Sequence, residues 1–156
     1  MSLETQLQEV IDREAIRDLA VKYAHFVSQK NIDGFLSLYA DDGVFLSSAD
    51  PAWPVARGQA ELRKLLTGMV ADKEIRPFSH NHVVQLLSSD RAIGTSYNRV
   101  FGLLRNGAPS LLVGRYDDKY SKIAGSWKFA LRDITCEYYG PPSEYRVPSP
   151  GVPHTL

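Results

Sequence analysis

Hydrophobic and polar residues follow one another along the first forty positions with the spacing of α-helices. An early apolar stripe is formed by Leu7, Val10 and Ile11. A second helix is expected after Asp12, a residue type that often caps helices, because apolar residues then recur every three or four positions. These residues are Ile16, Leu19, Ala20, Tyr23 and Val27. Residues 31–34 break the pattern, and a short third helix should follow and end at a turn over residues 41–43.

The remainder of the chain changes from helical spacing to the texture of β-strands. A short strand is expected at 44–46, then a loop at 49–54 whose two prolines exclude regular structure. An amphipathic helix is expected after Arg57-Gly58, with an apolar side formed by Leu62, Leu65, Leu66 and Met69. Four segments rich in Val, Ile, Leu, Tyr and Phe follow on short turns, which predicts an antiparallel meander. They are residues 78–87, 92–104, 110–122 and 126–137.

Helices followed by long antiparallel strands are typical of an α+β domain in which the helices pack on one face of a single sheet. We expect one domain over residues 1–140, in which the helices and a curved sheet enclose a pocket. Residues 141–156 hold five of the nine prolines and are expected to form an extended tail.

Composition and charge narrow the class of protein. The chain has 156 residues, with 18 basic and 18 acidic side chains, and this balance argues against a nucleic-acid partner. No apolar run reaches the roughly 18 residues of a membrane span, and no signal peptide is visible, so no membrane partner is expected. The single cysteine, Cys136, excludes an internal disulfide and a Cys-rich metal site, which predicts a cytoplasmic protein.

Several short strings together resemble the opening of SnoaL-like proteins, which belong to the NTF2-like superfamily. They are AIRDL at 15–19, YAH at 23–25 and YADDGV at 39–44. The Arg57-Gly58 helix entry and GSWKF at 125–129 fit the same pattern. This resemblance implies a cone of helices on a curved antiparallel sheet. It does not by itself imply an activity, because the superfold hosts unrelated chemistries.

Within this superfamily the chain most resembles the scytalone dehydratase and dehydrochlorinase branch. In that branch an Asp at the end of the long helix orients a His at the start of the first long strand, and the pair acts as a general base. Here the two positions hold Ser28 and Pro77. Neither side chain can accept a proton, so the activity of the branch is not carried over to this chain.

The first long strand carries a His-x-His pattern with an asparagine between the histidines. Alternation places His80 and His82 on one face, a spacing that metal ligands can have, but no third ligand is identifiable and no metal site is expected. If Pro77 faces the pocket, Asn81 faces it too, and both histidines face away. Asn81 is therefore a candidate to orient a carbonyl or hydroxyl group of a ligand, or its amide satisfies backbone groups.

The long N-terminal helix contributes two candidate catalytic residues, Tyr23 and His25. His25 lies one helical turn before Ser28, where it could stand beside the position of the missing carboxylate. Tyr23 lies on the apolar stripe, and its hydroxyl could reach the pocket. The alternatives are an ordinary polar surface residue for His25 and a core residue for Tyr23. Ser28 itself is counted among the substrate-binding candidates.

Later positions add further substrate-binding candidates. The expected register directs Asn98 and Tyr116 inward. Trp53, between two prolines, is either a lid over the pocket or a hydrophobic anchor for its loop. The pair Asp117-Asp118 is interpreted as exposed charge, because adjacent strand residues face opposite ways and cannot form a catalytic pair.

Two functions from different classes stay open. The first is a cofactor-free lyase or isomerase that acts on a small hydrophobic cyclic molecule with a rearranged set of polar groups. The second is a non-catalytic ligand-binding or assembly module, like the small subunit of ring-hydroxylating dioxygenases.

The chain is also expected to pair with itself, as a homotrimer or a homodimer, through the convex face of the sheet. Interface-like residues expected on that face are His80, His82, Val84, Leu86, Tyr97 and Arg99.

Overall fold

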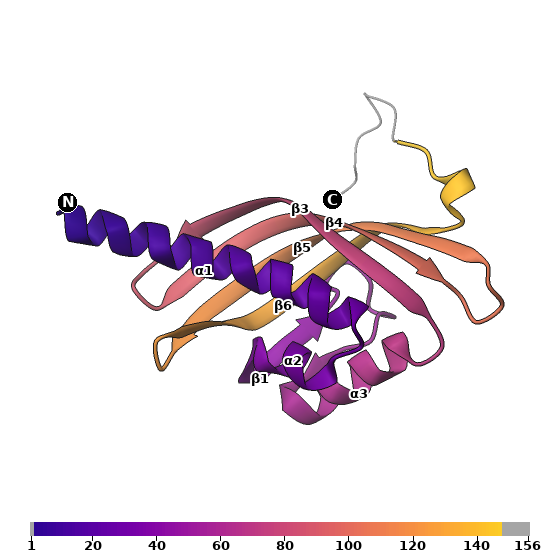
Figure 1. The fold of residues 1–156 in the computed structure, drawn as a ribbon, viewed down its shortest axis with the longest axis horizontal. Coiled ribbons are helices and arrows are strands. Elements are labelled where there is room, and N and C mark those ends of the chain that lie inside the picture. The colour runs from indigo at the N-terminus through magenta and orange to yellow at the C-terminus, as the bar shows by residue number, and fades with distance from the viewer. Residues whose placement is uncertain (1, 148–156) are drawn as a thin grey trace.

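A computed structural model describes residues 2–147 of the chain. Helices lie at one side and one end of a single curved sheet, so the α+β architecture is confirmed (Figure 1). The helices are α1 (Leu3–Ser28), α2 (Ile32–Ser37) and α3 (Gly58–Val70). The strands are β1 (Tyr39–Leu46), β2 (Ala56–Arg57), β3 (Glu74–Leu86), β4 (Arg91–Leu103), β5 (Pro109–Ile123) and β6 (Ser126–Gly140). No helix among the described residues is long and apolar enough to cross a membrane.

The N-terminal region forms one continuous helix instead of the two that were predicted. α1 begins after Ser2, whose Oγ accepts a hydrogen bond from the Thr5 backbone N–H at 3.2 Å. Asp12 does not cap a helix. Its buried carboxylate accepts hydrogen bonds from Lys122 Nζ at 2.7 Å and Trp127 Nε1 at 2.9 Å. Asp12, which was predicted to cap a helix, therefore connects α1 to the β5–β6 hairpin.

The break predicted at residues 31–34 is present, because Asn31 caps α2 by accepting the Gly34 N–H at 2.8 Å. The turn predicted at 41–43 is absent, since β1 runs through it with a register irregularity against β6. Gly43 permits this path: a β-carbon there would lie 2.9 Å from the Ala40 carbonyl oxygen.

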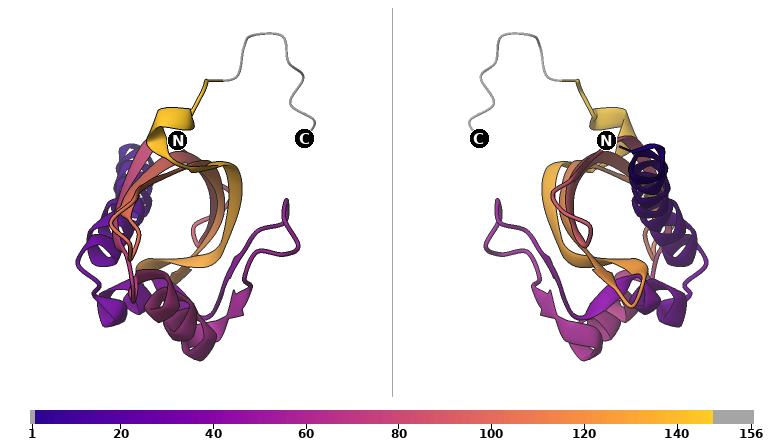
Figure 2. Two further views of the ribbon diagram at one scale, coloured as in Figure 1. Left: turned by 90° about the vertical axis from the view of Figure 1, so that its right-hand side faces the viewer. Right: turned by 90° about the vertical axis from the view of Figure 1, so that its left-hand side faces the viewer.

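The six strands form one sheet in the order β2-β1-β6-β5-β4-β3. The antiparallel meander of the four long strands is confirmed, while β1 joins β6 in parallel. The sheet curls strongly, and α1 lies along its β3 side (Figure 2). Of the tail predicted at 141–156, a 3-10 turn occupies Pro142–Glu144, and residues 148–156 lie outside the described residues.

A β-bulge in β3 overturns the prediction of which side chains face inward. The pairing with β4 shifts between His80 and Val83, and Asn81 has a φ of 50°. One extra residue in a strand reverses the alternation beyond it. Asn81 is therefore exposed, whereas His82 turns inward and meets Tyr120. Val84 and Leu86, predicted on the convex face, pack inward for the same reason.

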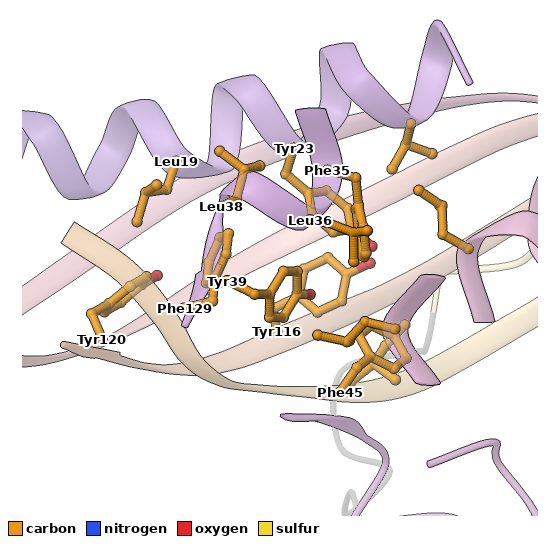
Figure 3. Packing of buried hydrophobic residues seen from close by; sticks show 14 of the residues in the cluster. Leu19, Tyr23, Phe35, Leu36, Leu38, Tyr39, Phe45, Tyr116, Tyr120 and Phe129 are labelled. Carbon is orange, nitrogen blue, oxygen red and sulfur yellow. The ribbon is translucent and has the colours of Figure 1, made fainter. Parts of the chain in front are cut away.

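The core lies between the helices and the inner face of the sheet (Figure 3). It is rich in aromatic rings that pack edge to face or tilted, with Tyr23 and Tyr116 centroids 5.9 Å apart and Tyr39 and Phe129 centroids 5.2 Å apart. This aromatic layer fills the middle of the core.

Candidate functional site

A mainly apolar cavity of about 290 Å³ opens beside α3 and the loop that precedes β2. Its apolar lining comes from Phe45, Trp53, Pro54, Leu65, Met69, Ile75, Val100, Leu112 and Ile134. Its polar lining comes from Lys73, Ser110, Tyr116 and Tyr139. Cavities of this size and character hold small ligands, oriented by a few polar groups.

Trp53, which lies between two prolines, is one of the residues that line this cavity. Its loop is held by an Asp50 turn, in which the carboxylate accepts the Ala52 N–H at 2.9 Å and the Asp50 carbonyl accepts the Trp53 N–H at 3.0 Å. The ring is half-buried against the core. Its action as a lid stays a prediction.

A buried arginine lies behind the cavity wall. The Arg132 side chain is fully buried, and its guanidinium carbon lies 4.0 Å from the ring centroid of Tyr116, a cavity-lining residue. The rings of Phe129 and Tyr23 lie at 4.1 and 4.4 Å from the same carbon. Three aromatic rings therefore surround one cation, an arrangement that stabilises the charge by cation–π attraction.

The counter-charge of Arg132 is Asp118, which is also buried. Its two carboxylate oxygens accept hydrogen bonds from Arg132 Nε at 2.9 Å and Nη2 at 2.8 Å. The prediction that Asp118 is exposed is wrong. Asp118 alternates in step with Tyr116 and Tyr120, which are both buried, and this shared parity was the signal that could have placed it inside.

The ion pair continues into a hydrogen-bonded chain. The Tyr120 hydroxyl donates to Asp118 Oδ2 at 2.9 Å, so its oxygen is left to accept from Nε2 of His82 at 3.0 Å. Burial, and secondarily the Asp118 charge, raise the pKa of Tyr120 far above its ordinary value. Burial lowers the pKa of the half-buried His82 and favours its neutral form.

Burial also raises the pKa of Tyr116 and of Tyr39 well above the ordinary tyrosine value. At neutral pH both hydroxyls therefore keep their protons and can donate a hydrogen bond. Among the described residues, several buried polar atoms have no hydrogen-bond partner, a rare condition in protein interiors. They are the Tyr39 hydroxyl, Ser96 Oγ, both Asn98 amide atoms and Arg132 Nη1.

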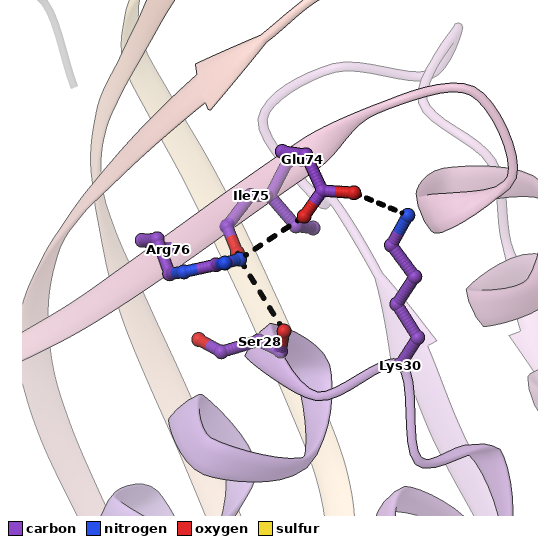
Figure 4. Close-up of polar contacts among 5 residues, drawn as sticks. All are labelled: Ser28, Lys30, Glu74, Ile75 and Arg76. Atoms are coloured by element: carbon purple, nitrogen blue, oxygen red, sulfur yellow. Dashed lines mark hydrogen bonds and ion pairs between the residues drawn. The ribbon is translucent and has the colours of Figure 1, made fainter.

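A surface ion-pair cluster lies at the end of α1 and the start of β3, the segments that hold Ser28 and Pro77 (Figure 4). Arg76 Nη1 donates to the Ser28 carbonyl at 3.3 Å and to Glu74 at 3.4 Å, and Lys30 pairs with Glu74 at 2.7 Å. The Lys30 ammonium lowers the pKa of Glu74. This cluster joins the end of α1 to the start of β3, and Pro77 is buried beside it. Its basic side chains lie at the C-terminal end of α1, where positive charge stabilises a helix.

The structure separates the sequence-predicted candidates into two groups. Tyr23, Asn98 and Tyr116 are buried on the inner side, and Ser28 is half-buried at the end of α1. His25 is exposed, because two residues along a helix rotate a side chain to nearly the opposite face from Tyr23. His25 therefore takes the polar surface position that was its alternative, whereas the inward position expected for Asn81 is wrong because of the bulge.

Comparison with known proteins places the chain in a family. The model of the SnoaL-like domain matches residues 8–133. No curated protein matches the sequence.

Several solved structures share the fold. The structure of a hexachlorocyclohexane dehydrochlorinase of type 2 superposes with a TM-score of 0.80 at 20% identity, covering 94% of this chain and 99% of that one. A provisionally named scytalone dehydratase from Novosphingobium aromaticivorans gives 0.79 at 18% identity, with 92% and 94% covered. A provisionally named aromatic ring hydroxylase from the same organism gives 0.77 at 25% identity, with 84% and 93% covered. Because the domain model spans most of the chain and the architecture is NTF2-like, this chain belongs to the SnoaL-like family.

Proposed function

We propose that the chain binds a small hydrophobic cyclic molecule that carries one oxygen acceptor, in the cavity that ends at Tyr116. The observation that carries this proposal is the lining: nine apolar side chains and few polar ones, with a tyrosine that stays protonated. Apolar walls supply affinity by removing ligand surface from water, and the tyrosine hydroxyl orients the ligand by donating one hydrogen bond.

The relatives agree with a ligand of this kind. The names of two similar structures refer to hexachlorocyclohexane and to aromatic rings, which are small cyclic molecules. Those names describe the other proteins; for this chain they support the size and shape of the proposed ligand.

A second candidate is catalysis, as a cofactor-free lyase or isomerase. Tyr116 beside a buried cation is the observation that favours it, because a donor held in a dry site stabilises the oxyanion that forms when a proton leaves carbon next to a carbonyl. Among the described residues that line the cavity there is no histidine and no carboxylate to take that proton. Ligand binding is therefore the function that the geometry supports best.

Calorimetry with the bicyclic hydrocarbon tetralin and the ketone 1-tetralone tests the proposal. We expect both to bind the native chain, and Leu112→Trp to abolish binding because the larger ring fills the cavity. Leu103→Trp, at an exposed position on β4, is the matched control and should leave binding unchanged. Absence of binding in the native chain, or equal binding by Leu112→Trp, would contradict the proposal.

A further inference from the structure

We infer that Arg132 is a specificity-determining residue that acts through Tyr116: the buried cation makes the Tyr116 hydroxyl a stronger hydrogen-bond donor, so that the cavity selects cyclic ketones or enols over hydrocarbons of the same shape. This inference rests on the proposed function, because it concerns the ligand of the same cavity. Arg132 is not among the residues that line the cavity, so its effect must pass through the ring that separates them.

The stacking geometry supplies the physical basis. A cation 4.0 Å from the centroid of a phenol ring attracts the π electrons and withdraws density from the hydroxyl. Burial and the neighbouring Tyr23 hydroxyl raise the pKa of Tyr116, and the Arg132 charge works in the opposite direction, so the hydroxyl stays protonated and is polarised at the same time. In a water-excluded interior such a charge acts more strongly than it would at the surface.

The orientation of the ion pair leaves one end of the cation uncompensated. Asp118 binds the Nε and Nη2 edge of the guanidinium, and Nη1 has no partner among the described residues. The carboxylate also accepts the Tyr120 hydroxyl, so its negative charge is drawn further toward the His82 side. The pair is neutral as a whole but behaves as a dipole. A neutral ligand with a strongly accepting oxygen therefore fits this site better than a charged one.

Tetralin and 1-tetralone form the matched pair of probes, since they differ only by the carbonyl group. We expect the native chain to bind the ketone about three- to tenfold more tightly, the range of one net hydrogen bond. Tyr116→Phe should abolish that preference. Tyr97→Phe is the matched control, because it removes an exposed tyrosine hydroxyl outside the cavity lining, and it should change neither affinity.

The carbonyl stretching frequency of bound 1-tetralone reports the strength of the hydrogen bond directly, which a merely structural role would not change. Replacing the pair together in Arg132→Met/Asp118→Leu should move the stretch to higher wavenumber and reduce the ketone preference at least twofold. Asp118→Asn keeps the arginine and removes its counter-charge, so it should move the stretch to lower wavenumber. General disruption of packing would not strengthen a hydrogen bond. If Arg132→Met/Asp118→Leu does not fold, Asp118→Asn by itself still decides the test.

The possible failures are distinguishable. If the native chain binds neither probe, the proposed function is wrong. If it binds both probes with equal affinity, or if Asp118→Asn leaves the stretch unchanged or raises it, the role of Arg132 is overturned and ligand binding stands.

Discussion

Replacing one member of the Asp118–Arg132 pair is expected to cost more stability than replacing both. Both side chains are fully buried, and two charge-assisted hydrogen bonds of 2.8 and 2.9 Å join them. Arg132→Met leaves a buried carboxylate without its cation, which costs about 3–5 kcal/mol of unfolding free energy. Asp118→Leu leaves the cation unpaired and should cost a similar amount. In the double variant the Tyr120 hydroxyl loses its acceptor, at a cost of about 1–2 kcal/mol.

Urea unfolding, followed by tryptophan fluorescence and circular dichroism, measures the four free energies of this cycle. The matched control is Arg115→Met, because Arg115 and Asp117 form an ion pair of 2.9 Å at a partly exposed position. Solvent screens that pair, so its loss should cost less than about 1 kcal/mol. A double variant that costs as much as either single variant, or more, would refute the reasoning, since it would mean that the two charges do not compensate each other.

Three further predictions follow from other parts of the molecule. Burial lowers the pKa of His82 below its ordinary 6.5. The folded state therefore gains stability as the pH rises through the range just below 6.5, and loses it as the pH falls. The urea midpoints at pH 5 and pH 7.5 should differ less in His82→Gln than in the native chain. Asp12→Ala leaves the Lys122 and Trp127 donors without their shared acceptor and should lower the unfolding free energy by about 2–3 kcal/mol. An unchanged thermal midpoint would show that these hydrogen bonds between α1 and the β5–β6 hairpin do not stabilise the fold. We also propose that the chain forms a homo-oligomer, a trimer or a dimer, through the exposed aromatic residues of the convex face. Light scattering at neutral pH should report more than one copy for the native chain and a monomer for Phe101→Glu. A monomeric native chain would exclude this assembly.

Ser28 and Pro77 yield a fifth prediction, on activity. The chain should not dehydrate scytalone or eliminate chloride from hexachlorocyclohexane at neutral pH, because Ser28 and Pro77 cannot accept a proton. Chromatography of the substrates after prolonged incubation is the measurement. Turnover of either one would show that another base replaces the dyad.

Local patterns along the chain were sufficient for the fold class and for most of the elements. Spacing of apolar residues indicated the helices around Tyr23 and Leu66, and turn residues separated the four long strands in an antiparallel order. These features depend on neighbours a few positions apart, which is the range over which periodicity carries information. Tyr116 on β5 is buried on the inner side, as the expected register directed, whereas Asp118 on the same strand was expected to be exposed and is buried.

Only the tertiary structure decided the site. One bulge residue, Asn81, reverses the alternation of β3 and turns His82 inward, and nothing in the residue pattern marks where a strand gains an extra residue. Asp12 resembles a helix cap until the β5–β6 hairpin brings Trp127 to it, 115 positions along the chain. The same holds for Arg132, whose burial depends on a carboxylate across the hairpin and on rings from α1, β5 and β6 together. A charge can be buried only where all of its partners converge, and that convergence is a property of the packed fold.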